Sequence, residues 1–361
     1  MQRRISLLSL LFLLVVSACD STDPAVRVVT GIYVGNQGNF ADNNGSVTVY
    51  DPATGQTNAD AIPNLRGLVQ NILIDGDSAF VLLNFDDSFS TGHGRIDIVD
   101  LNTNQRTAQI DVNTPRSAVL DGNTLWVSNL YANTVTPIDL ITNTPGTPID
   151  VGSNPEGIVM ASGNLFVANN GFGESTTVSV IDMATRTVSQ TLDLGCDGPR
   201  NLSADGDGEV WVFCTGKTIY DEDFNIIGQT NGAAVVLNGA TGSENDRTDL
   251  DAQLGGVGGA IGQDAFMVAG RNEAWAVKGA QLLRFDTATN MLVETITPQI
   301  PANHFIGAVG YDEVNDRLLI GAVLDYVSAG TVVIANRAGA EVASFTAGIA
   351  PTTVVVREGE Q

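Results

Sequence analysis

The chain has 361 residues, 43% of them hydrophobic, and its 17 basic and 41 acidic residues give a formal net charge of −24. A surface this acidic repels nucleic acid and anionic membranes, so neither is expected to bind the folded chain. We interpret the charge as adaptation to a saline, halophilic environment, where salt screens self-repulsion, with an acidic partner-binding face as the alternative.

The N-terminal segment has the pattern of an export signal. A basic start precedes an apolar run over residues 5–16, which is too short to remain as a membrane-spanning helix. The run ends in Val16-Ser17-Ala18-Cys19, which resembles the bacterial lipobox, in which the cysteine is acylated and becomes the new N-terminus.

This resemblance implies a lipoprotein signal peptide over residues 1–18, a lipid-anchored tether over residues 19–29 and a folded domain over residues 30–361, with Cys19 as the acylated residue. An ordinary signal peptide followed by an incidental cysteine is the alternative. The lipoprotein hypothesis implies a protein of the cell envelope, periplasmic or surface-exposed, that contacts the membrane only through its anchor.

A four-strand unit, whose strands we name A to D, recurs along the rest of the chain. Its B strand is a short apolar run, and its C strand ends at Asp or Asn before a turn into D. Strand B is expected at Ile32–Asn36, Phe80–Asn84, Leu125–Asn129, Leu165–Asn169, Val210–Cys214, Ala274–Lys278 and Leu318–Ala322. The matching C strands end at Asp51, Asp100, Asp139, Asp182, Asn238, Asp286 and Asn336.

The acidic residues at these C-strand ends are expected to close turns. Asp and Asn side chains accept hydrogen bonds from backbone amides two residues further on, which stabilises the turn. Residues 205–209 alternate acidic residues with glycines, but they occupy an A–B hairpin turn and lack the later Glu that a calcium loop requires. We therefore expect no metal site there.

Repeats of about 40 to 55 residues with four strands each are typical of a β-propeller. The first unit lacks strand A, and residues 350–356, a proline followed by apolar residues, match the missing strand. The sequence therefore predicts an all-β, seven-bladed β-propeller of four-stranded antiparallel blades, closed by the C-terminal strand so that no sheet edge stays free.

Two units carry a family resemblance. Trp126-Val127-Ser128-Asn129 and Phe166-Val167-Ala168-Asn169, each followed by a C strand that ends in Ile-Asp, are similar to the YVTN-type repeats of bacterial and archaeal extracytoplasmic propellers. The similarity is weaker in the last three units, where the Asn is replaced by Cys214, Lys278 and Ala322. The resemblance implies a propeller outside the cytoplasm and no single activity, since members are mostly binding or surface proteins and related propellers house quinone or haem chemistry.

Cys196 and Cys214 are the two cysteines outside the signal segment, and the repeat register places them at the same end of one blade. Outside the cytoplasm such a pair is expected to form a disulfide, with two buried free thiols as the alternative.

The candidate site lies at the mouth of the central channel. D–A connections and B–C loops gather on one face of a propeller, where function is usually found. The residue after the A-strand proline, or its equivalent, is Gln70, Arg116, Glu156, Arg200 or Thr352, and His304 lies just before this position in the last unit.

The succession of Arg116, Glu156 and Arg200 supports two interpretations, which are compatible. One is a site for a small anionic ligand, with the two arginines as bidentate donors, in which Gln70 and His304 take part. The other is a structural Arg-Glu-Arg ion-pair cluster that joins three blades.

The long B–C loops, residues 36–45, 84–94 and 215–232, form the rest of that face. They carry the aromatic residues Phe40, Phe85, Phe89, Tyr220 and Phe224. These rings either stack on a sugar or peptide, or pack the loops onto the sheets.

The sequence lacks HExxH, Walker and GxSxG motifs, and it has two histidines and no CxxCH. We therefore expect no catalytic residues, no bound metal and no cofactor. The predicted function is that of an envelope binding or scaffold protein for a small anionic ligand, a glycan or another envelope protein. The alternative is a propeller enzyme, a hydrolase such as a lactonase or a quinone-dependent oxidoreductase, that uses the channel mouth.

Overall fold

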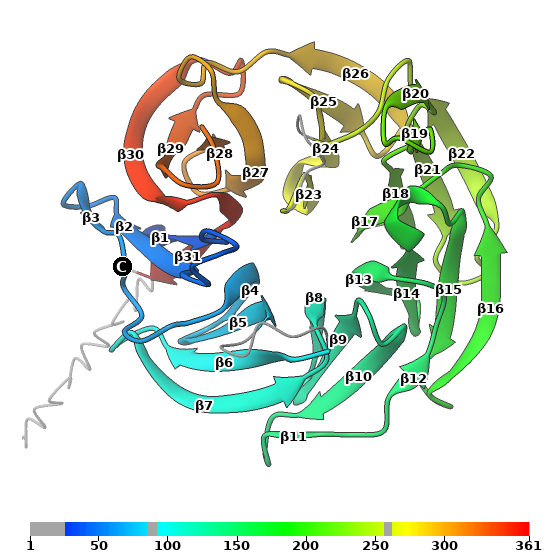
Figure 1. The fold of residues 1–361 in the computed structure, drawn as a ribbon, viewed down its shortest axis with the longest axis horizontal. Coiled ribbons are helices and arrows are strands. Elements are labelled where there is room, and N and C mark those ends of the chain that lie inside the picture. The colour runs from blue at the N-terminus through cyan, green and yellow to red at the C-terminus, as the bar shows by residue number, and fades with distance from the viewer. Residues whose placement is uncertain (1–25, 86–91, 256–261, 361) are drawn as a thin grey trace, which may run out of the picture.

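The structure is a computed structural model that describes residues 26–85, 92–255 and 262–360. It confirms the predicted fold: seven antiparallel sheets stand around a common axis, as Figure 1 shows. The expected signal peptide, Cys19 and Phe89 lie outside the described residues. In the part of the chain that is described, no helix has the length and apolar character to cross a membrane.

The first four blades, each given from strand A outward to strand D, share one order of strands. Blade 1 consists of β31 (Pro351–Glu360), β1 (Arg27–Asn36), β2 (Ser46–Asp51) and β3 (Gln56–Asn58). Blade 2 consists of β4 (Leu68–Asp75), β5 (Ser78–Phe85), β6 (Gly94–Asp100) and β7 (Gln105–Val112). Blade 3 consists of β8 (Pro115–Asp121), β9 (Thr124–Asn129), β10 (Thr134–Asp139) and a D strand in two pieces, β11 (Thr144–Pro145) and β12 (Ile149–Asp150). Blade 4 consists of β13 (Pro155–Ala161), β14 (Asn164–Asn169), β15 (Thr177–Asp182) and β16 (Thr187–Asp193), with η1 (Gly171–Gly173) in its B–C loop.

The other three blades repeat this order. Blade 5 consists of β17 (Pro199–Ala204), β18 (Glu209–Cys214), β21 (Ala233–Asn238) and β22 (Glu244–Asp249), with a hairpin of β19 (Thr218–Tyr220) and β20 (Ile226–Gln229) in its B–C loop. Blade 6 consists of β23 (Ala265–Val268), β24 (Glu273–Lys278), β25 (Gln281–Asp286) and β26 (Met291–Ile296), with η2 (Ala269–Arg271) after β23. Blade 7 consists of β27 (Phe305–Asp312), β28 (Arg317–Val323), β29 (Ala329–Ala335) and β30 (Glu341–Ile349).

The two ends of the described chain close the ring. Strand β31 pairs with β1 from Asn36↔Pro351 to Arg27↔Glu360. Strand β1 begins at Arg27, so the last residues of the expected tether extend blade 1. These residues join the sheet because their backbone pairs with β31. In addition, the Arg27 guanidinium donates from Nε to Glu358 Oε2 at 2.8 Å.

The hydrophobic core lies between neighbouring sheets. The three tryptophans occupy the same position of their B strands, and each is at most 1% exposed. Trp126 packs with Leu165 and Val167 of blade 4, and Trp211 meets Phe285 of blade 6 with ring centroids 5.5 Å apart. Sheet-to-sheet packing of this kind fixes the positions of the inner strands, which carry the site.

The Asn that ends the B strand ties it to the C strand. Asn129 Nδ2 donates to Thr134 Oγ1 at 3.1 Å and to Thr136 Oγ1 at 2.7 Å, and Asn169 makes the same pair of bonds to Thr177 and Ser179. In blade 5 the Asn and both of its hydroxyl partners are replaced together. Cys214 takes the place of the Asn, and Ala233 and Val235 take the places of the two hydroxyl residues. Replacing the Asn by Cys214 therefore leaves none of these three positions with a polar side chain that lacks its partner.

The predicted turn chemistry is confirmed. Asp139 Oδ1 accepts from the amides of Ile141 at 2.8 Å and Thr142 at 3.2 Å, and these bonds lower the pKa of Asp139. Asp205 accepts from two turn amides and from the Trp211 indole, so it belongs to a hairpin turn.

Candidate functional site

A β-bulge near the start of the innermost strand recurs in six blades. Each bulge leaves one or two residues of strand A without a partner on strand B, and such a residue turns its side chain out of the ladder. The residues in these bulges include Gln70, Arg116, Glu156, Arg200, Gly307 and Thr352. The bulge thus brings four of the five predicted ligand-binding residues to the centre of the ring.

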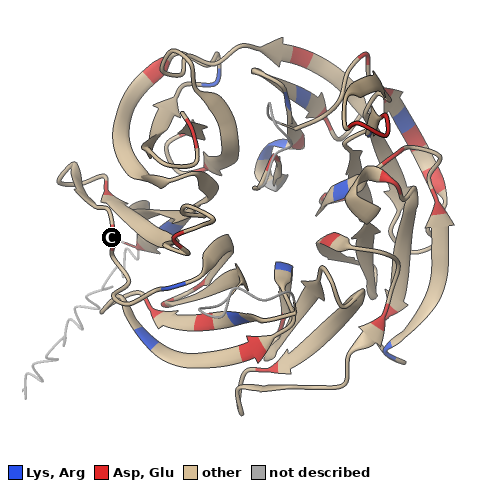
Figure 2. Ribbon diagram, viewed as in Figure 1, with Lys and Arg blue, Asp and Glu red and all other residues tan. Residues whose placement is uncertain are grey.

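Arg116 is the centre of a hydrogen-bonded chain across three blades. Its guanidinium donates from Nε to Glu156 Oε2 at 2.8 Å, from Nη2 to Glu156 Oε1 at 2.7 Å and from Nη1 to Gln70 Oε1 at 2.6 Å. The side chains of Arg116 and Glu156 are 9% and 12% exposed. Figure 2 shows the arrangement as a red segment on β13 between blue segments on β8 and β17. The structural interpretation of the cluster therefore holds for Arg116 and Glu156.

Arg200 pairs in the other direction, with blade 6. Its Nη1 lies 3.4 Å from Asp264 Oδ2, and its Nη2 donates to the Gly262 carbonyl at 3.3 Å. The other carboxylate oxygen of Asp264 accepts from Asn201 Nδ2. Burial raises the pKa of the Asp264 carboxyl, the charge of Arg200 lowers it, and the charge of Glu156 raises it further. The polar side chains from Gln70 to Asp264, which we call the ring, thus come from blades 2 to 6 and form two bonded groups, one around Arg116 and one around Arg200.

His304 lies apart from this ring. Its Nδ1 is 3.0 Å from the Ala302 carbonyl oxygen in its own connector, and it lines neither of the two central cavities. The bulge of blade 7 falls three residues later, at Gly307, where a Cβ would lie 2.5 Å from Val323 and 2.7 Å from the Pro351 carbonyl. Blade 7 therefore contributes no side chain to the ring.

Two cavities meet at the ring. The inner cavity, of about 320 Å³, lies among the A strands. The outer cavity, of about 990 Å³, opens among the B–C loops and D–A connectors, on what we call the loop face. Arg116, Glu156 and Arg200 line both cavities, so these three side chains form the partition between them.

Basic side chains are concentrated at the outer cavity. Both lysines of the chain, Lys217 and Lys278, line it together with Arg116 and Arg200. The lysine side chains are 27% and 19% exposed, while their carboxylate partners, Glu174 and Asp251, are 67% and 84% exposed. The hydrogen bond from Lys217 to Glu174 raises the pKa of the lysine, which keeps it charged. The outer cavity thus gathers four basic side chains, each in an ion pair with a carboxylate, in a strongly acidic protein.

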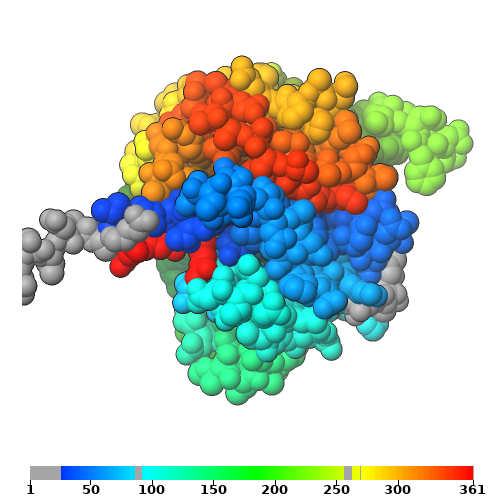
Figure 3. All heavy atoms as spheres, turned by 90° about the vertical axis from the view of Figure 1, so that its left-hand side faces the viewer, coloured from blue at the N-terminus to red at the C-terminus, as the bar shows by residue number. Residues whose placement is uncertain are grey.

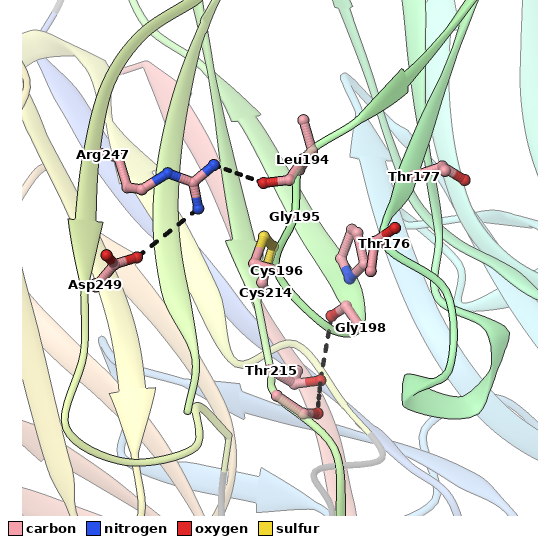
Figure 4. The surroundings of a disulfide bond; sticks show 12 residues. Thr176, Thr177, Leu194, Gly195, Cys196, Gly198, Cys214, Thr215, Arg247 and Asp249 are labelled. Carbon is pink, nitrogen blue, oxygen red and sulfur yellow. Dashed lines mark hydrogen bonds and ion pairs between the residues drawn. A yellow bond between two sulfur atoms is a disulfide. The ribbon is translucent and has the colours of Figure 1, made fainter. Parts of the chain in front are cut away.

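The structure joins Cys196 and Cys214 in a disulfide, shown in Figure 4. Beside it, the Thr215 amide donates to the Gly198 carbonyl at 2.9 Å and the Gly216 amide donates to the Asp197 carbonyl at 2.9 Å. Arg200 follows Cys196 by four residues, and Lys217 follows Cys214 by three. The disulfide thus links the two segments that bring a cation to the outer cavity from blade 5.

The aromatic loop residues both pack and line the cavity. Phe40, Phe85, Tyr131 and Phe172 form a row over blades 1 to 4, with successive ring centroids 6.0, 6.3 and 6.1 Å apart. All four line the outer cavity, as does Tyr220. Phe224, at the tip of the β19–β20 hairpin, is 84% exposed and lies outside this lining.

Sequence reasoning missed the site roles of Lys217, Lys278, Tyr131 and Phe172. Two features of the sequence could have identified Lys278. It replaces the repeat Asn of blade 6, and lysine is scarce in this chain. Lys217 follows the B strand of blade 5 inside its long loop, and only the loop path brings it to the cavity. Over the described ranges, no group of three or more His, Cys, Asp or Glu side chains could hold a metal ion.

Comparison with solved structures agrees with the fold. Hydrazine synthase of Kuenenia stuttgartiensis matches 83% of this chain and 97% of its own with a TM-score of 0.62 and 15% identity. A quinoprotein alcohol dehydrogenase-like protein of Bacteroides thetaiotaomicron matches 91% of this chain and 78% of its own with a TM-score of 0.67 and 12% identity. Apo AztD of Citrobacter koseri matches 91% and 98% with a TM-score of 0.54 and 13% identity.

The chain is a seven-bladed β-propeller. Identities this low show the shared fold and carry no statement on activity. No protein-family model matches the sequence, and no curated protein matches it.

Proposed function

We propose that the chain is a binding protein of the cell envelope that takes a small anionic ligand in the outer cavity. The single observation that carries the proposal is the placement of Arg116, Arg200, Lys217 and Lys278 around one hollow in a chain of net charge −24. The carboxylate partners of the two lysines are mostly exposed, so an anion can compete for the ammonium groups at short range, while salt screens the acidic groups elsewhere on the surface.

Catalysis at the channel mouth, the alternative function, has weaker support. The Glu156 carboxylate accepts two hydrogen bonds from Arg116, and the Asp264 carboxylate is buried beside Arg200 and Asn201. Both carboxylates are thus held in ion pairs. Such carboxylates position the neighbouring arginines and are poorly placed to act as a general base.

The envelope location rests on the lipobox-like Val16 to Cys19 and on the YVTN-type repeats, and it is part of the proposal. The geometry is compatible with an anchor. Figure 3 shows the start of β1, in blue, on the side of the molecule opposite the light green β19–β20 hairpin of the loop face. A tether that joins the propeller at Arg27 would leave the outer cavity open on the side away from the membrane.

Isothermal titration with sulfate, phosphate and simple carboxylates tests the proposal. Replacing both lysines, Lys217→Gln with Lys278→Gln, is expected to weaken anion binding about 10-fold, equivalent to about 1.4 kcal/mol. The matched control is Arg27→Gln with Arg271→Gln, which removes the same two charges from exposed pairs away from the cavity. Equal losses in both double variants would contradict a site at the cavity, since only the net charge would matter.

A second candidate function, binding of a protein partner, is favoured by the β19–β20 hairpin. Its outer surface exposes Phe224 at 84% and Ile227 at 66%, and its tip carries Glu222 and Asp223. An apolar surface with an acidic tip is complementary to an apolar patch bordered by basic side chains, and the acidic tip disfavours an anionic membrane. We propose a protein partner with such a patch.

Photo-crosslinking from position 224 in cells, followed by titration of the purified partner, tests this second function. Ile227→Ser should weaken the binary complex about 10-fold, because the lost apolar contact is worth about 1 to 2 kcal/mol. Ile141→Ser, at an isoleucine that is 74% exposed in the C–D turn of blade 3, is the control. Crosslinks to lipid or to a second copy of this chain would contradict a separate protein partner.

A further inference from the structure

We propose that the ligand of the outer cavity is an amphipathic organic anion, whose charged end lies among the cations of blades 5 and 6 and whose apolar part lies on the aromatic row of blades 1 to 4. This inference rests on the proposed function and narrows it to one chemical class. It requires that the basic side chains and the aromatic rings lie on different parts of the cavity wall, which the anion-binding proposal alone does not require.

The first observation is the aromatic row. Its members come from four different blades, and each ring contacts the next at a centroid distance close to 6 Å. Phe40, Tyr131 and Phe172 remain 56%, 41% and 63% exposed, while Phe85 is buried beneath them. Several exposed rings at the edge of one cavity are typical of a surface that buries apolar ligand atoms.

The second observation is the backbone at Phe172. This residue has a φ of 56°, in the left-handed region that bulky side chains rarely adopt. Asn170 holds the turn, because its side-chain oxygen accepts from the Gly173 amide at 3.1 Å and its Nδ2 donates to the Pro199 carbonyl at 3.3 Å. A loop that keeps an aromatic ring exposed in an unfavourable conformation suggests a use for that ring.

The third observation is the separation of charge from the row. Lys217 follows β18 and Lys278 ends β24. The four rings lie on blades 1 to 4, where Phe85 ends β5 and the other three belong to B–C loops (Figure 1). Arg116 and Arg200 lie in the partition between the inner and outer cavities. An inorganic anion would use the cations alone, and a neutral sugar would use the rings alone. A ligand that carries both an anionic group and an apolar part uses both walls.

The cavity volume of about 990 Å³ suits such a molecule. Small-molecule sites typically have about 300 to 1,000 Å³ and combine an apolar lining with a few polar groups. The net negative charge of the protein repels anions at long range, which weakens binding by the cations alone. Burial of the apolar part of the ligand adds affinity that does not depend on charge.

The experiment compares four probes by titration calorimetry: 2-naphthoate, decanoate, 2-naphthalenemethanol and sulfate. Naphthoate or decanoate is expected to bind at least about 10-fold more tightly than both sulfate and the neutral naphthalene, since each of these lacks one of the two interactions. The comparison of naphthoate with decanoate then distinguishes a flat ring from an acyl chain as the apolar part.

The variants separate this inference from the proposed function. Phe172→Ser with Tyr131→Ser should weaken naphthoate or decanoate binding about 10-fold and change sulfate binding less than about 2-fold, because exposed rings do not contribute to the cation site. Ile141→Ser, far from the cavity, is the control. If sulfate binds in a lysine-dependent way and neither organic anion binds more tightly, the amphipathic ligand is wrong and the anion site stands. If neither sulfate nor an organic anion depends on the lysines, both proposals fail.

Discussion

The guanidinium of Arg116 and the carboxylate of Glu156 form a two-point hydrogen-bonded pair between blades 3 and 4, with both side chains about nine-tenths buried. The pair is fixed from below, since Ser128 Oγ donates to the Glu156 carbonyl at 2.6 Å and accepts from the Ser117 amide at 3.1 Å. Ser128 is the third residue of the repeat motif of blade 3, so the motif of this blade also holds the backbone of Glu156 in blade 4. A buried pair of this kind is costly to break and inexpensive to replace as a whole.

Removing one member of this pair should destabilise the protein more than removing both. Arg116→Met leaves the Glu156 carboxylate buried without its partner and is expected to lower the free energy of unfolding by about 3 kcal/mol. The double variant Arg116→Met with Glu156→Leu should recover most of that loss. Urea unfolding followed by tryptophan fluorescence gives both values. A double variant as unstable as the sum of the single variants would show that the two residues do not act as a pair.

Asp264 makes part of the stability dependent on pH. Its pKa is raised in the folded protein, so its contribution is fully present below the pKa of the unfolded chain and is lost as the pH rises through the folded value. We expect the stability of the native protein relative to Asp264→Asn to increase as the pH falls from neutral toward about 4. Melting curves of the two proteins across this range measure the difference. If the stability difference between the two proteins stayed constant, or decreased as the pH fell, the raised pKa would be contradicted.

The sequence predicts most of the ring, because a proline marks the start of strand A in blades 3, 4 and 5. The residue after that proline falls in the bulge, so Arg116, Glu156 and Arg200 are readable without a structure. Blade 7 has Ile306 at the position of that proline, and its bulge residue is a glycine, so the sequence pattern predicted His304 instead. The Pro351 carbonyl leaves no room for a side chain at Gly307, and local sequence does not show that contact.

Two further features required the folded chain. The D strand of blade 3 is split between β11 and β12, because Pro145 and Pro148 lack the amide hydrogen that a continuous ladder needs. The aromatic row joins residues from four blades, and it exists only because the blades place the ends of their B strands and their B–C loops side by side. Periodicity identifies the strands, whereas contacts between loops depend on how the blades are arranged around the axis.

The disulfide should contribute both stability and ligand affinity. It joins residues 18 apart in sequence, and a loop of that length predicts about 3 kcal/mol of stabilisation through restriction of the unfolded chain. Cys196→Ala with Cys214→Ala should therefore lower the free energy of unfolding by about that amount. The same variant should weaken anion binding, because the segments that carry Arg200 and Lys217 lose their covalent link. Unchanged affinity in a destabilised variant would show that the hydrogen bonds around Gly198 are sufficient to place the two cations.

Closure by β31 should be essential for folding. Ending the chain at Ala350 removes the innermost strand of blade 1, exposes the edge of β1 and deletes Thr352, whose Oγ1 donates to the carbonyls of Gly35 and Val69 at 3.1 Å. We expect this variant to aggregate or remain unfolded, since a free apolar strand edge recruits other chains. Ending the chain at Arg357 is the control.

The control variant loses the ion pair of Arg27 with Glu358, whose side chains are 60% and 31% exposed, and it should change the free energy of unfolding by about 1 kcal/mol or less. It keeps the Arg357 bonds to the Leu101 carbonyl at 2.9 Å and Asn102 Oδ1 at 2.7 Å, which fasten blade 1 to blade 2. A peptide of residues 351–361 added to the shorter chain during refolding should restore a monomer, because it supplies the missing strand by β-augmentation. Size-exclusion chromatography distinguishes the outcomes: a soluble, folded monomer without β31 or the peptide would show that six complete blades and a three-stranded sheet suffice.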